Sequence, residues 1–305
     1  MDGFSVERFP FKHGYHGAVL YNRKKYLAQN ETKNLIRFNW LLNGEVVISC
    51  NLYMLGSRLN NAIYSSFGGL EVSNVGLSAL DKFIDALALW CSRNGIFEIE
   101  LKCSGNFYQG SSMDLLSGIL SKGFVSVIKE TNQHIKIQKQ CYTEIIEADE
   151  RRKLRKCKEA KFDFQLLEPW LLPDSYELIA DTRIRKNYPV SMTLLALENM
   201  FKSLSDHYFL FGVYDSNKLI ATSVSIKVTE HILYNFYVGD DVAYRNYSPV
   251  VMLLKGIYEY CQTNGFDYMD LGISSYRGEL NQGLFQFKKN CGAQASDKYV
   301  LKLKI

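Results

Sequence analysis

The sequence lacks the patterns that identify several large classes of protein. No apolar run reaches the roughly 18 residues that a membrane-spanning helix needs, and the first 17 residues lack the apolar core of a signal peptide. The chain also has none of the motifs G-x-x-x-x-G-K-[ST], G-x-G-x-x-G, G-x-S-x-G or H-E-x-x-H. We therefore expect a cytoplasmic protein without a transmembrane segment, and none of the common nucleotide, hydrolase or metalloprotease signatures assigns its function.

Metal-binding patterns are also missing. The seven cysteines include no C-x-x-C pair, so neither a zinc site nor a redox pair is predicted, and free thiols in a reducing compartment are expected. Of the five histidines, only His13 and His16 are close in sequence, and no Asp or Cys stands near them. A metal site is therefore not expected.

The excess of positive charge is small. The chain has 36 Lys and Arg against 32 Asp and Glu, which gives a formal charge of +4 over 305 residues. This excess does not predict nucleic-acid binding by itself, and DNA is not an expected partner. In contrast, 47% of the residues are hydrophobic, with 20 Tyr and 18 Phe. Such a composition excludes general disorder and predicts one large domain or two ordinary ones.

Hydrophobic periodicity predicts alternating strands and helices. In the first half we expect strands over 35–50 (with a hairpin turn at Asn43-Gly44), 61–67, 96–101 and 124–137, and helices from Leu80 to Asn94 and over 113–121. In the second half we expect strands over 162–167, 208–214, 219–228, 233–238, 268–273 and 298–305. The helices there are expected over 175–185, 191–204, 249–264, with Pro249 in the first turn, and 280–290.

The two halves show an internal correspondence. A shift of 170 positions places Tyr64 on Tyr234, Gly69 on Gly239, Cys91 on Cys261, Asn94 on Asn264, Gly95 on Gly265 and Leu101 on Leu271, and a shift of 169 places Gly123 on Gly292. The matched positions also follow the same order of helix, glycine and strand. This pattern predicts two copies of one α/β unit, an N-terminal lobe over 1–143 and a C-terminal lobe over 162–305.

The segment between the predicted lobes, 144–161, contains no Gly or Pro and is expected to form a helical connector. Glu147, Arg151 and Arg155 follow at i, i+4 spacing. Six basic residues fall within eight positions: Arg151, Arg152, Lys153, Arg155, Lys156 and Lys158. Two interpretations remain open, a solvated helix held by charge pairs and an arm that faces phosphate, RNA or an acidic substrate.

The C-terminal section resembles a known family. A strand ending in Asp270-Leu271-Gly272 leads to a run that contains Gly283-Leu284-Phe285-Gln286-Phe287-Lys288-Lys289-Asn290-Cys291-Gly292. This run resembles the closing motif of the FemAB-like and BioF2-like acyltransferases, a branch of the GNAT superfamily. Three further segments are similar to parts of that family, namely Ser65–Gly69, the connector with Phe162-Asp163-Phe164, and Asp181–Lys186 followed by Pro189.

The resemblance implies an α/β fold of two tandem GNAT-like lobes, each a twisted mixed sheet flanked by helices. In such lobes the central strands separate and leave a cleft where the acyl donor meets the amine acceptor. The C-terminal lobe carries the motif and is expected to hold the active site.

The resemblance also implies roles for individual residues. Aminolysis of an activated ester needs positive charge or N–H donors near the developing oxyanion, and Lys288 stands at the family position for that charge. The other interpretation of Lys288 is a surface residue on an amphipathic helix. Further candidates are Tyr234 and Asp270 for catalysis, and Phe287, Tyr237, Arg183, Arg185 and Arg155 for substrate binding.

The acyl donor stays open between acyl-CoA and aminoacyl-tRNA. Acyl-CoA-dependent GNAT lobes carry R/Q-x-x-G-x-G/A before the third helix, where backbone N–H groups hold pyrophosphate. This chain has the segments Ala243–Pro249 and Glu71–Leu77 at those places, and neither provides a Gly-rich nest. No resident cofactor or metal is expected.

Three functions are compatible with the sequence. The first is an N-acyl- or aminoacyltransferase of FemAB/BioF2-like type that modifies an amino group of a cell-envelope or polysaccharide precursor, with tRNA left open as a partner. The second is a GNAT N-acetyltransferase that uses acyl-CoA through an atypical loop. The third is a catalytically inert GNAT-fold binding protein, since one fold hosts many functions.

Overall fold

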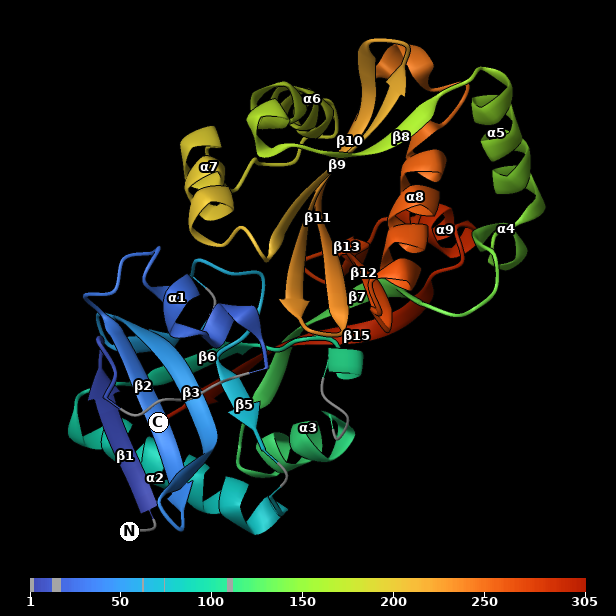
Figure 1. The fold of residues 1–305 in the computed structure, drawn as a ribbon. Coiled ribbons are helices and arrows are strands. Elements are labelled where there is room, and N and C mark those ends of the chain that lie inside the picture. Colours follow the sequence, from blue (N-terminus) through green and yellow to red (C-terminus); the bar gives the residue numbers. More distant parts are fainter. Residues whose placement is uncertain (1–2, 13–17, 62, 74, 109–111) are drawn as a thin grey trace. The chain divides into compact units, whose positions relative to one another are not determined.

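A computed structural model describes residues 3–12, 18–61, 63–73, 75–108 and 112–305 (Figure 1). The chain forms two compact units. Unit 1 contains Met1–Thr131, Ser275–Glu279 and Ser296–Ile305, and unit 2 contains Asn132–Ser274 and Leu280–Ala295. Across the described residues, no helix is both long and apolar enough to cross a membrane.

Unit 1 is built on a mainly antiparallel sheet with the strand order β1-β2-β3-β4-β6-β15, and β5 pairs with β3. Its strands are β1 (Gly3–Arg8), β2 (Leu35–Leu42), β3 (Glu45–Leu55), β4 (Arg58–Asn60), β5 (Leu70–Val72), β6 (Glu98–Lys102) and β15 (Gln294–Lys304). The pair β4 and β6 is parallel. The helices α2 (Leu77–Arg93) and α3 (Ser112–Ser121) share a core with the sheet, in which Phe83 and Leu87 of α2 meet Ile99 of β6.

Unit 2 has the strand order β7-β12-β11-β10-β9-β8. The strands are β7 (Val125–Lys136, in unit 2 from Asn132 onward), β8 (Asp163–Leu167), β9 (Tyr208–Asp215), β10 (Lys218–Thr229), β11 (Ile232–Asp240) and β12 (Tyr268–Ile273). Strand β11 pairs parallel with β12, whereas β8 with β9, β9 with β10, β10 with β11 and β12 with β7 are antiparallel pairs. The helices are α4 (Tyr142–Ile145), α5 (Ala148–Glu159), α6 (Leu172–Arg185), α7 (Leu194–Ser203), α8 (Pro249–Thr263) and α9 (Gln282–Asn290).

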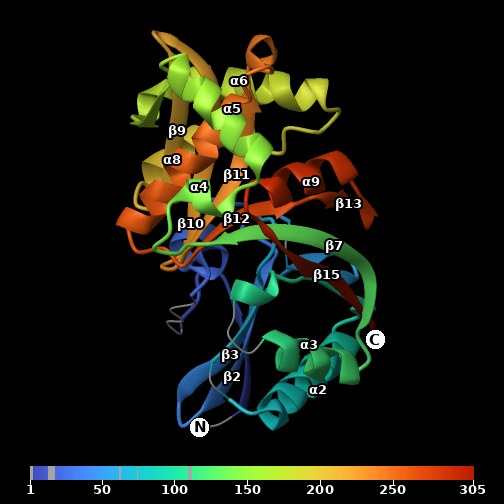
Figure 2. The same cartoon turned by 90° about the vertical axis from the view of Figure 1, so that its right-hand side faces the viewer.

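Helices cover both faces of the sheet in unit 2. Val238 of β11 packs into the core that contains Val251 and Leu254 of α8. The next residue, Gly239, lies against α6, because a Cβ atom there would be 2.7 Å from the backbone nitrogen of Ile179. Successive residues of a strand point to opposite faces, so α8 and α6 lie on opposite sides of β11. Helices α4 and α5 lie beside α8 (Figures 1 and 2).

Most of the elements predicted from the sequence are confirmed. The hairpin turn lies at Asn43-Gly44, α2 ends before Asn94, and Pro249 is the first residue of α8. The strand predicted over 61–67 is wrong, because β4 ends at Asn60 and the next strand begins at Leu70. After Asn60, hydrogen bonds to the backbone of Lys102 come from the Asn61 side chain. Its Oδ1 accepts from the Lys102 backbone nitrogen at 2.8 Å and its Nδ2 donates to the Lys102 carbonyl at 3.1 Å.

The compact units differ from the predicted lobes at residues 132–143, 144–161, 275–279 and 296–305. The expected connector, 144–161, forms α4 and α5 within unit 2, where Leu154 and Cys157 are buried in the same core as α8. The last strand, β15, pairs antiparallel with β6 of unit 1 from Val300↔Lys102 to Lys304↔Glu98. The limits of the sequence repeat, 1–143 and 162–305, stay a prediction.

A buried polar network connects the first strands of unit 1. The Arg37 guanidinium donates from Nε to Asn51 Oδ1 at 2.9 Å and from Nη2 to the Asn22 carbonyl at 3.1 Å. The Gly69 N–H donates to Asn22 Oδ1 at 2.9 Å. Two residues further along the chain, the Glu71 side chain is only 5% exposed. The Glu71 carboxylate accepts from the Val19 backbone nitrogen at 2.8 Å. Removal from water nevertheless raises the pKa of Glu71 above its ordinary value.

This raised pKa predicts a pH-dependent effect of the substitution Glu71→Gln. The Glu71 carboxyl is protonated more easily in the folded than in the unfolded protein. Its contribution to the free energy of unfolding is therefore fully present below about pH 4.3 and is lost as the pH rises through the raised pKa. Glutamine does not titrate. We expect the free energy of unfolding of the Gln variant, relative to wild type, to increase between pH 5 and pH 8 in urea unfolding experiments.

The variant Glu159→Gln, at an exposed position of α5, corrects for the loss of one negative charge. A difference between the Glu71→Gln variant and wild type that is the same at both pH values would contradict the assignment.

Candidate functional site

Unit 2 contains a cavity of about 500 Å³. It lies between β11 and β12 and is bordered by the start of α8, by α9 and by the residues that follow α6. The lining side chains are Lys186, Tyr188, Asn235, Val238, Asp240, Ser248, Val250, Leu254, Leu271, Asn281, Leu284, Phe287 and Lys288. The cavity therefore has an apolar interior with charged and amide groups at a few places, as binding sites for small molecules usually do.

The cavity exists because two parallel strands separate. The paired register of β11 and β12 runs from Ile232↔Tyr268 to Tyr234↔Asp270 and goes no further. Between β10 and β11 the register then shifts, with Ser225 opposite Asn235 and Val224 opposite Tyr237. Phe236 is the extra residue of this β-bulge, and bulges of this kind re-aim side chains next to active sites.

The bulge determines which side chains of β11 line the cavity. In a regular strand, Asn235 and Val238 would lie on opposite faces. The additional residue at Phe236 brings both onto one face together with Asp240, and all three line the cavity. The buried Asn235 is held in place because its Oδ1 accepts hydrogen bonds from the hydroxyls of Ser223 and Ser225 on β10.

On the other side of the cavity, β12 changes direction at Gly272. This residue has a φ of +72°, a backbone conformation that favours glycine. The Asp270 side chain, 0% exposed, supports the bend by accepting from the Gly272 backbone nitrogen at 2.8 Å and from Asn132 Nδ2 at 2.9 Å. The Tyr234 ring packs on the bend, since a Cβ atom at residue 272 would lie 3.3 Å from its Cε2.

The bend presents two backbone carbonyl oxygens to Lys288. The Lys288 ammonium donates to the Gly272 carbonyl at 3.0 Å and to the Ile273 carbonyl at 2.9 Å. The residue is 7% exposed and stands in the last turn of α9, where the helix dipole favours a cation. The arrangement holds a positive charge at the apolar wall formed by Leu284, Phe287 and Leu271.

A strap formed by residues 186–193, between α6 and α7, borders the cavity through Lys186 and Tyr188. The buried Tyr237 holds the strap, because its hydroxyl oxygen accepts from the backbone nitrogens of Ser191 at 3.0 Å and Met192 at 3.1 Å. Arg183 lies over the Tyr237 ring, 5.0 Å from its centre, and donates from Nε to the Pro189 carbonyl at 2.6 Å.

The other end of the strap is joined to α9. Asn281, which caps the start of α9 by accepting from the Leu284 backbone nitrogen at 3.0 Å, donates from Nδ2 to the Tyr188 hydroxyl at 3.0 Å. The strap and the helix that carries Lys288 are therefore positioned by the same side chain.

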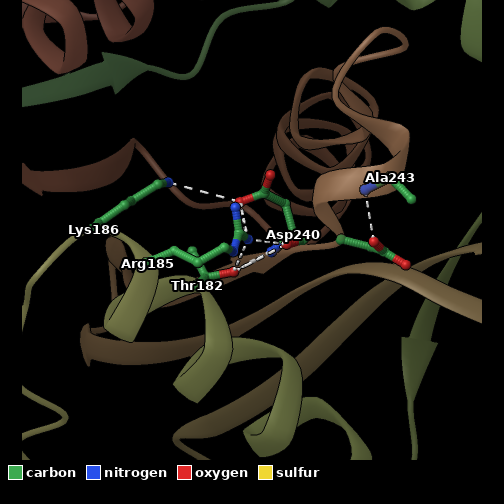
Figure 3. A network of polar contacts seen from close by, with 6 residues as sticks. Thr182, Arg185, Lys186, Asp240 and Ala243 are labelled. Carbon is green, nitrogen blue, oxygen red and sulfur yellow. Dashed lines mark hydrogen bonds and ion pairs between the residues drawn. The ribbon is translucent and has the colours of Figure 1, made fainter.

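Charged groups gather where β11 ends (Figure 3). Asp240 Oδ1 lies 3.7 Å from Arg185 Nη2 and 3.7 Å from Lys186 Nζ. Thr182 joins the network from α6, because its hydroxyl accepts from the Asp240 backbone nitrogen at 2.9 Å and from Arg185 Nη2 at 3.0 Å. The adjacent Asp241 is paired with Lys218 at 2.7 Å. With three cations near two carboxylates, this edge carries one excess positive charge and favours an anionic group.

The start of α8, which also borders the cavity, offers few backbone donors. Pro249 occupies the first helical position and has no N–H. The N–H of Ser248 is bonded to the carbonyls of Tyr244 and Arg245, at 3.2 Å each, and the N–H of Val251 is bonded to the Ser248 carbonyl at 2.9 Å. This helix start differs from a Gly-rich loop, in which successive N–H groups point at phosphate.

The residues predicted from the sequence occupy different places around this cavity. Lys288 and Phe287 line it, Arg185 lies in the charged network at its edge, and Arg155 is exposed on α5. The remaining candidates stand behind the lining: Tyr234 and Asp270 at the bend of β12, and Tyr237 and Arg183 at the strap. Whether each performs the chemistry expected of it stays a prediction.

Sequence reasoning missed six polar residues of the lining, among them Lys186 in the strap and Ser248 before α8. Asn235, Asp240, Tyr188 and Asn281 come from a strand, a strand end, the strap and a helix cap. A polar residue inside an apolar strand is a weak signal for Asn235, and Asn281 at the start of a helix reads as an ordinary cap. His13 and His16 lie outside the described residues, and the described part of the chain contains no group of three or more His, Cys, Asp or Glu placed to hold a metal ion.

Comparisons with known proteins agree with this geometry. Residues 148–289 match the family model described as the acetyltransferase (GNAT) domain. No curated protein sequence matches the chain.

Among solved structures, the chain is similar to FemX, with a TM-score of 0.73 and 14% identity over 94% of this chain and 92% of that chain. It is also similar to a tandem GNAT protein from the clavulanic acid biosynthesis pathway, with a TM-score of 0.52 and 11% identity over 88% and 82% of the two chains. The C-terminal domain of a putative lysylphosphatidylglycerol synthetase from Agrobacterium fabrum has a TM-score of 0.55 and 12% identity over 84% and 81%. Residues 148–289 therefore match a GNAT domain, and the chain has a fold similar to those of FemX and of a tandem GNAT protein.

Proposed function

We propose that this protein transfers an aminoacyl or acyl group from an activated ester to an amine, and that the cavity of unit 2 is its active site. The observation that carries the proposal is the buried ammonium of Lys288, held against an apolar wall between two separating strands. A cation is costly to bury, and here it stands beside a space large enough for an acyl group.

The chemistry follows from aminolysis. The neutral amine of the acceptor attacks the carbonyl carbon of the donor, and the carbonyl oxygen becomes negatively charged in the tetrahedral intermediate. The Lys288 charge stabilises that oxygen, while the apolar side chains around it exclude water and strengthen the interaction. The carbon–oxygen or carbon–sulfur bond to the carrier then breaks, and the carrier leaves with the proton that the amine loses.

The remaining predicted residues support this arrangement in different ways. Phe287 contacts the acyl portion, and Arg185 offers charge to an anionic part of a substrate. Asp270 and Tyr234 act through the bend at Gly272, which sets the position of the Lys288 ammonium, and are positioning residues. Tyr237 and Arg183 act through the strap.

Aminoacyl-tRNA is the donor that the cavity favours. A CoA donor places pyrophosphate at the start of the helix that corresponds to α8, and here Pro249 and the bonded N–H of Ser248 remove donors from that place. An aminoacyl ester has no pyrophosphate to hold. The fold of a lysylphosphatidylglycerol synthetase, a protein named for attaching an aminoacyl group, is a further similarity that supports aminoacyl transfer.

The basic surface of α5 is the part of unit 2 suited to the phosphates of tRNA. Arg155, Lys156 and Lys158 are exposed, and no ion pair of theirs occurs within the described residues. Use of aminoacyl-tRNA places the reaction in the cytoplasm. The acceptor is an amino-bearing precursor of the cell envelope or of a polysaccharide, and the excess positive charge around Asp240 suits the phosphate of a nucleotide-linked or lipid-linked precursor.

The substitution Lys288→Met tests the proposed active site. Methionine keeps much of the side-chain volume and removes the charge, so we expect the transfer rate to fall by about 100- to 1000-fold, as loss of an oxyanion-stabilising group does. The measurement is single-turnover transfer from pooled radiolabelled aminoacyl-tRNA to nucleotide-linked muropeptides and amino sugars.

The neighbouring Lys289 is exposed, and Lys289→Met is the matched control, expected to stay within about twofold of wild type. Circular dichroism verifies that both variants fold. A folded Lys288→Met variant with wild-type transfer would overturn the assignment.

A second experiment identifies the donor. We expect calorimetry to show no tight binding of CoA or acetyl-CoA, and a nonhydrolysable aminoacyl-tRNA to bind with an affinity that decreases with salt. Loss of one phosphate contact in Arg155→Ala lowers the slope of log K against log salt by about 1, whereas Lys202→Ala, at an exposed position of α7, leaves the slope unchanged.

Tight CoA binding with no tRNA binding would instead support an acyl-CoA-dependent N-acetyltransferase. Failure of both donors, combined with tight binding of a glycan or a lipid, would support a catalytically inert binding protein.

A further inference from the structure

A second cavity, of about 100 Å³, lies within unit 1. Its walls come from the segment between β4 and β5, from β6 and the residues after it, from α3, from β15 and from the segment around Asn22. The lining side chains are Val19, Asn22, Asn61, Phe67, Leu70, Leu101, Cys103, Ser104, Asn106, Leu115, Leu116, Ile119, Asp297 and Tyr299, together with Gly68. Most of this surface is aliphatic or aromatic.

The internal repeat relates this cavity to the one in unit 2. The hairpins β2-β3 and β9-β10 have the same register, with Trp40 opposite Ile48 and Val213 opposite Ala221. Because Cys50 lies opposite Leu70 as Ser223 lies opposite Val238, Leu70 corresponds to Val238. The shift of 170 positions places another lining residue, Leu101, on Leu271. The shift of 169 that aligns the following segment places Leu115 on Leu284 and Ile119 on Lys288. Four corresponding positions therefore line both cavities.

The counterpart in unit 1 has no charge at the position that corresponds to Lys288, and the ammonium of Lys298 lies over the ring of Phe67, 4.5 Å from its centre. Ile119, which is buried, stands at the position that corresponds to Lys288. An aliphatic side chain has no N–H donor and no charge for an oxyanion. The cavity of unit 1 is therefore shaped for binding and not for acyl transfer.

The unit 1 cavity is also closed toward the helix that corresponds to α8. In unit 2 the lining extends to Ser248 and Val250 at the start of α8, whereas no residue of α2 is part of the lining described in unit 1. Instead α2 packs directly on α3, because a Cβ atom at Gly118 would lie 2.9 Å from Leu80 Cδ2 and 3.1 Å from Leu77 Cδ2.

The size and the polar groups limit the ligand further. An apolar cavity of about 150 Å³ holds benzene, so a cavity of about 100 Å³ holds roughly three or four carbon atoms. Two buried amides form part of the wall and are fixed by the chain, Asn61 by Lys102 and Asn22 by Gly69. Asn106 and Ser104 add further uncharged groups, and the carboxylate of the lining residue Asp297 is paired with Lys129 at 2.9 Å. Such groups match a neutral amide better than an ion.

We propose that the unit 1 cavity is a second, non-catalytic binding site, which takes the short aliphatic chain of a neutral amide, either an N-acyl group or an aliphatic residue in a peptide. The site is independent of the transfer reaction proposed for unit 2, because its residues all belong to unit 1.

The test uses isobutyramide as the probe for an N-acyl group and N-acetyl-valine amide as the probe for a peptide residue. Binding is followed by calorimetry and by methyl NMR of protein labelled at leucine and isoleucine. We expect saturable binding of at least one probe in the millimolar range, with the largest shifts at the Ile119 and Leu115 methyl groups. The probe that binds more tightly identifies the source of the amide, and hexanamide and benzamide exceed the cavity and bind at least tenfold more weakly.

Four variants keep the test independent of folding failure. Leu116→Phe fills the cavity and lowers the affinity for the preferred probe at least tenfold, while Leu120→Phe, at an exposed position of the same helix, leaves it unchanged. Ile119→Ala enlarges the cavity and shifts the preference toward hexanamide. Lys288→Met retains probe binding, so failure of this inference and failure of the proposed transfer are distinguishable.

Absence of saturable binding by both probes, or equal affinity in the Leu116→Phe variant, would overturn the proposal. Shifts confined to residues of unit 2 would do the same.

Discussion

The separation of β11 from β12 is the constraint on which the rest of the candidate site depends. Two parallel strands that stay paired leave no space between them, because their side chains pack against the helices on both faces. Here the pairing ends at Tyr234↔Asp270, and each strand then departs from regular geometry in its own way. The bulge at Phe236 turns β11, and the left-handed conformation of Gly272 turns β12. The cavity lies between the bulge of β11 and the bend of β12.

The same departures explain how a buried cation is tolerated. An ammonium that leaves water needs hydrogen-bond acceptors to compensate for its lost hydration, and in a regular strand the carbonyls of Gly272 and Ile273 would point in opposite directions to neighbouring strands. The bend supplies both carbonyls to Lys288, and Asp270 stabilises the bend through the Gly272 N–H. A chain of contacts therefore runs from Asn132 through Asp270 and Gly272 to the ammonium, and the polar groups behind the cavity determine where its charge stands.

Local patterns predicted most of the fold, and the reasons for the failures are physical. Helix limits and the hairpin at Asn43-Gly44 follow from caps and turn residues close in sequence. The strand predicted over 61–67 failed because the Asn61 side chain bonds to the backbone of Lys102, 41 residues away. Lys288 was found through its motif, whereas Asn235 was not, because its place on the cavity face depends on a bulge that sequence periodicity does not reveal. The pairing of β15 with β6 is likewise non-local.

The two cavities share corresponding positions in the internal repeat predicted from the sequence, and they have different chemical properties. Sequence identity between the halves is confined to a few positions, but the corresponding residues that line the two cavities show what was kept, namely a space between a strand, its neighbour and a short helix. At the position shared by residues 119 and 288, unit 1 carries isoleucine and unit 2 carries lysine. Because burial of a cation requires the bend at Gly272 and its acidic support, the charge cannot be moved to the other half by exchanging that one side chain alone. The difference between the halves therefore extends from the lining into the strand behind it.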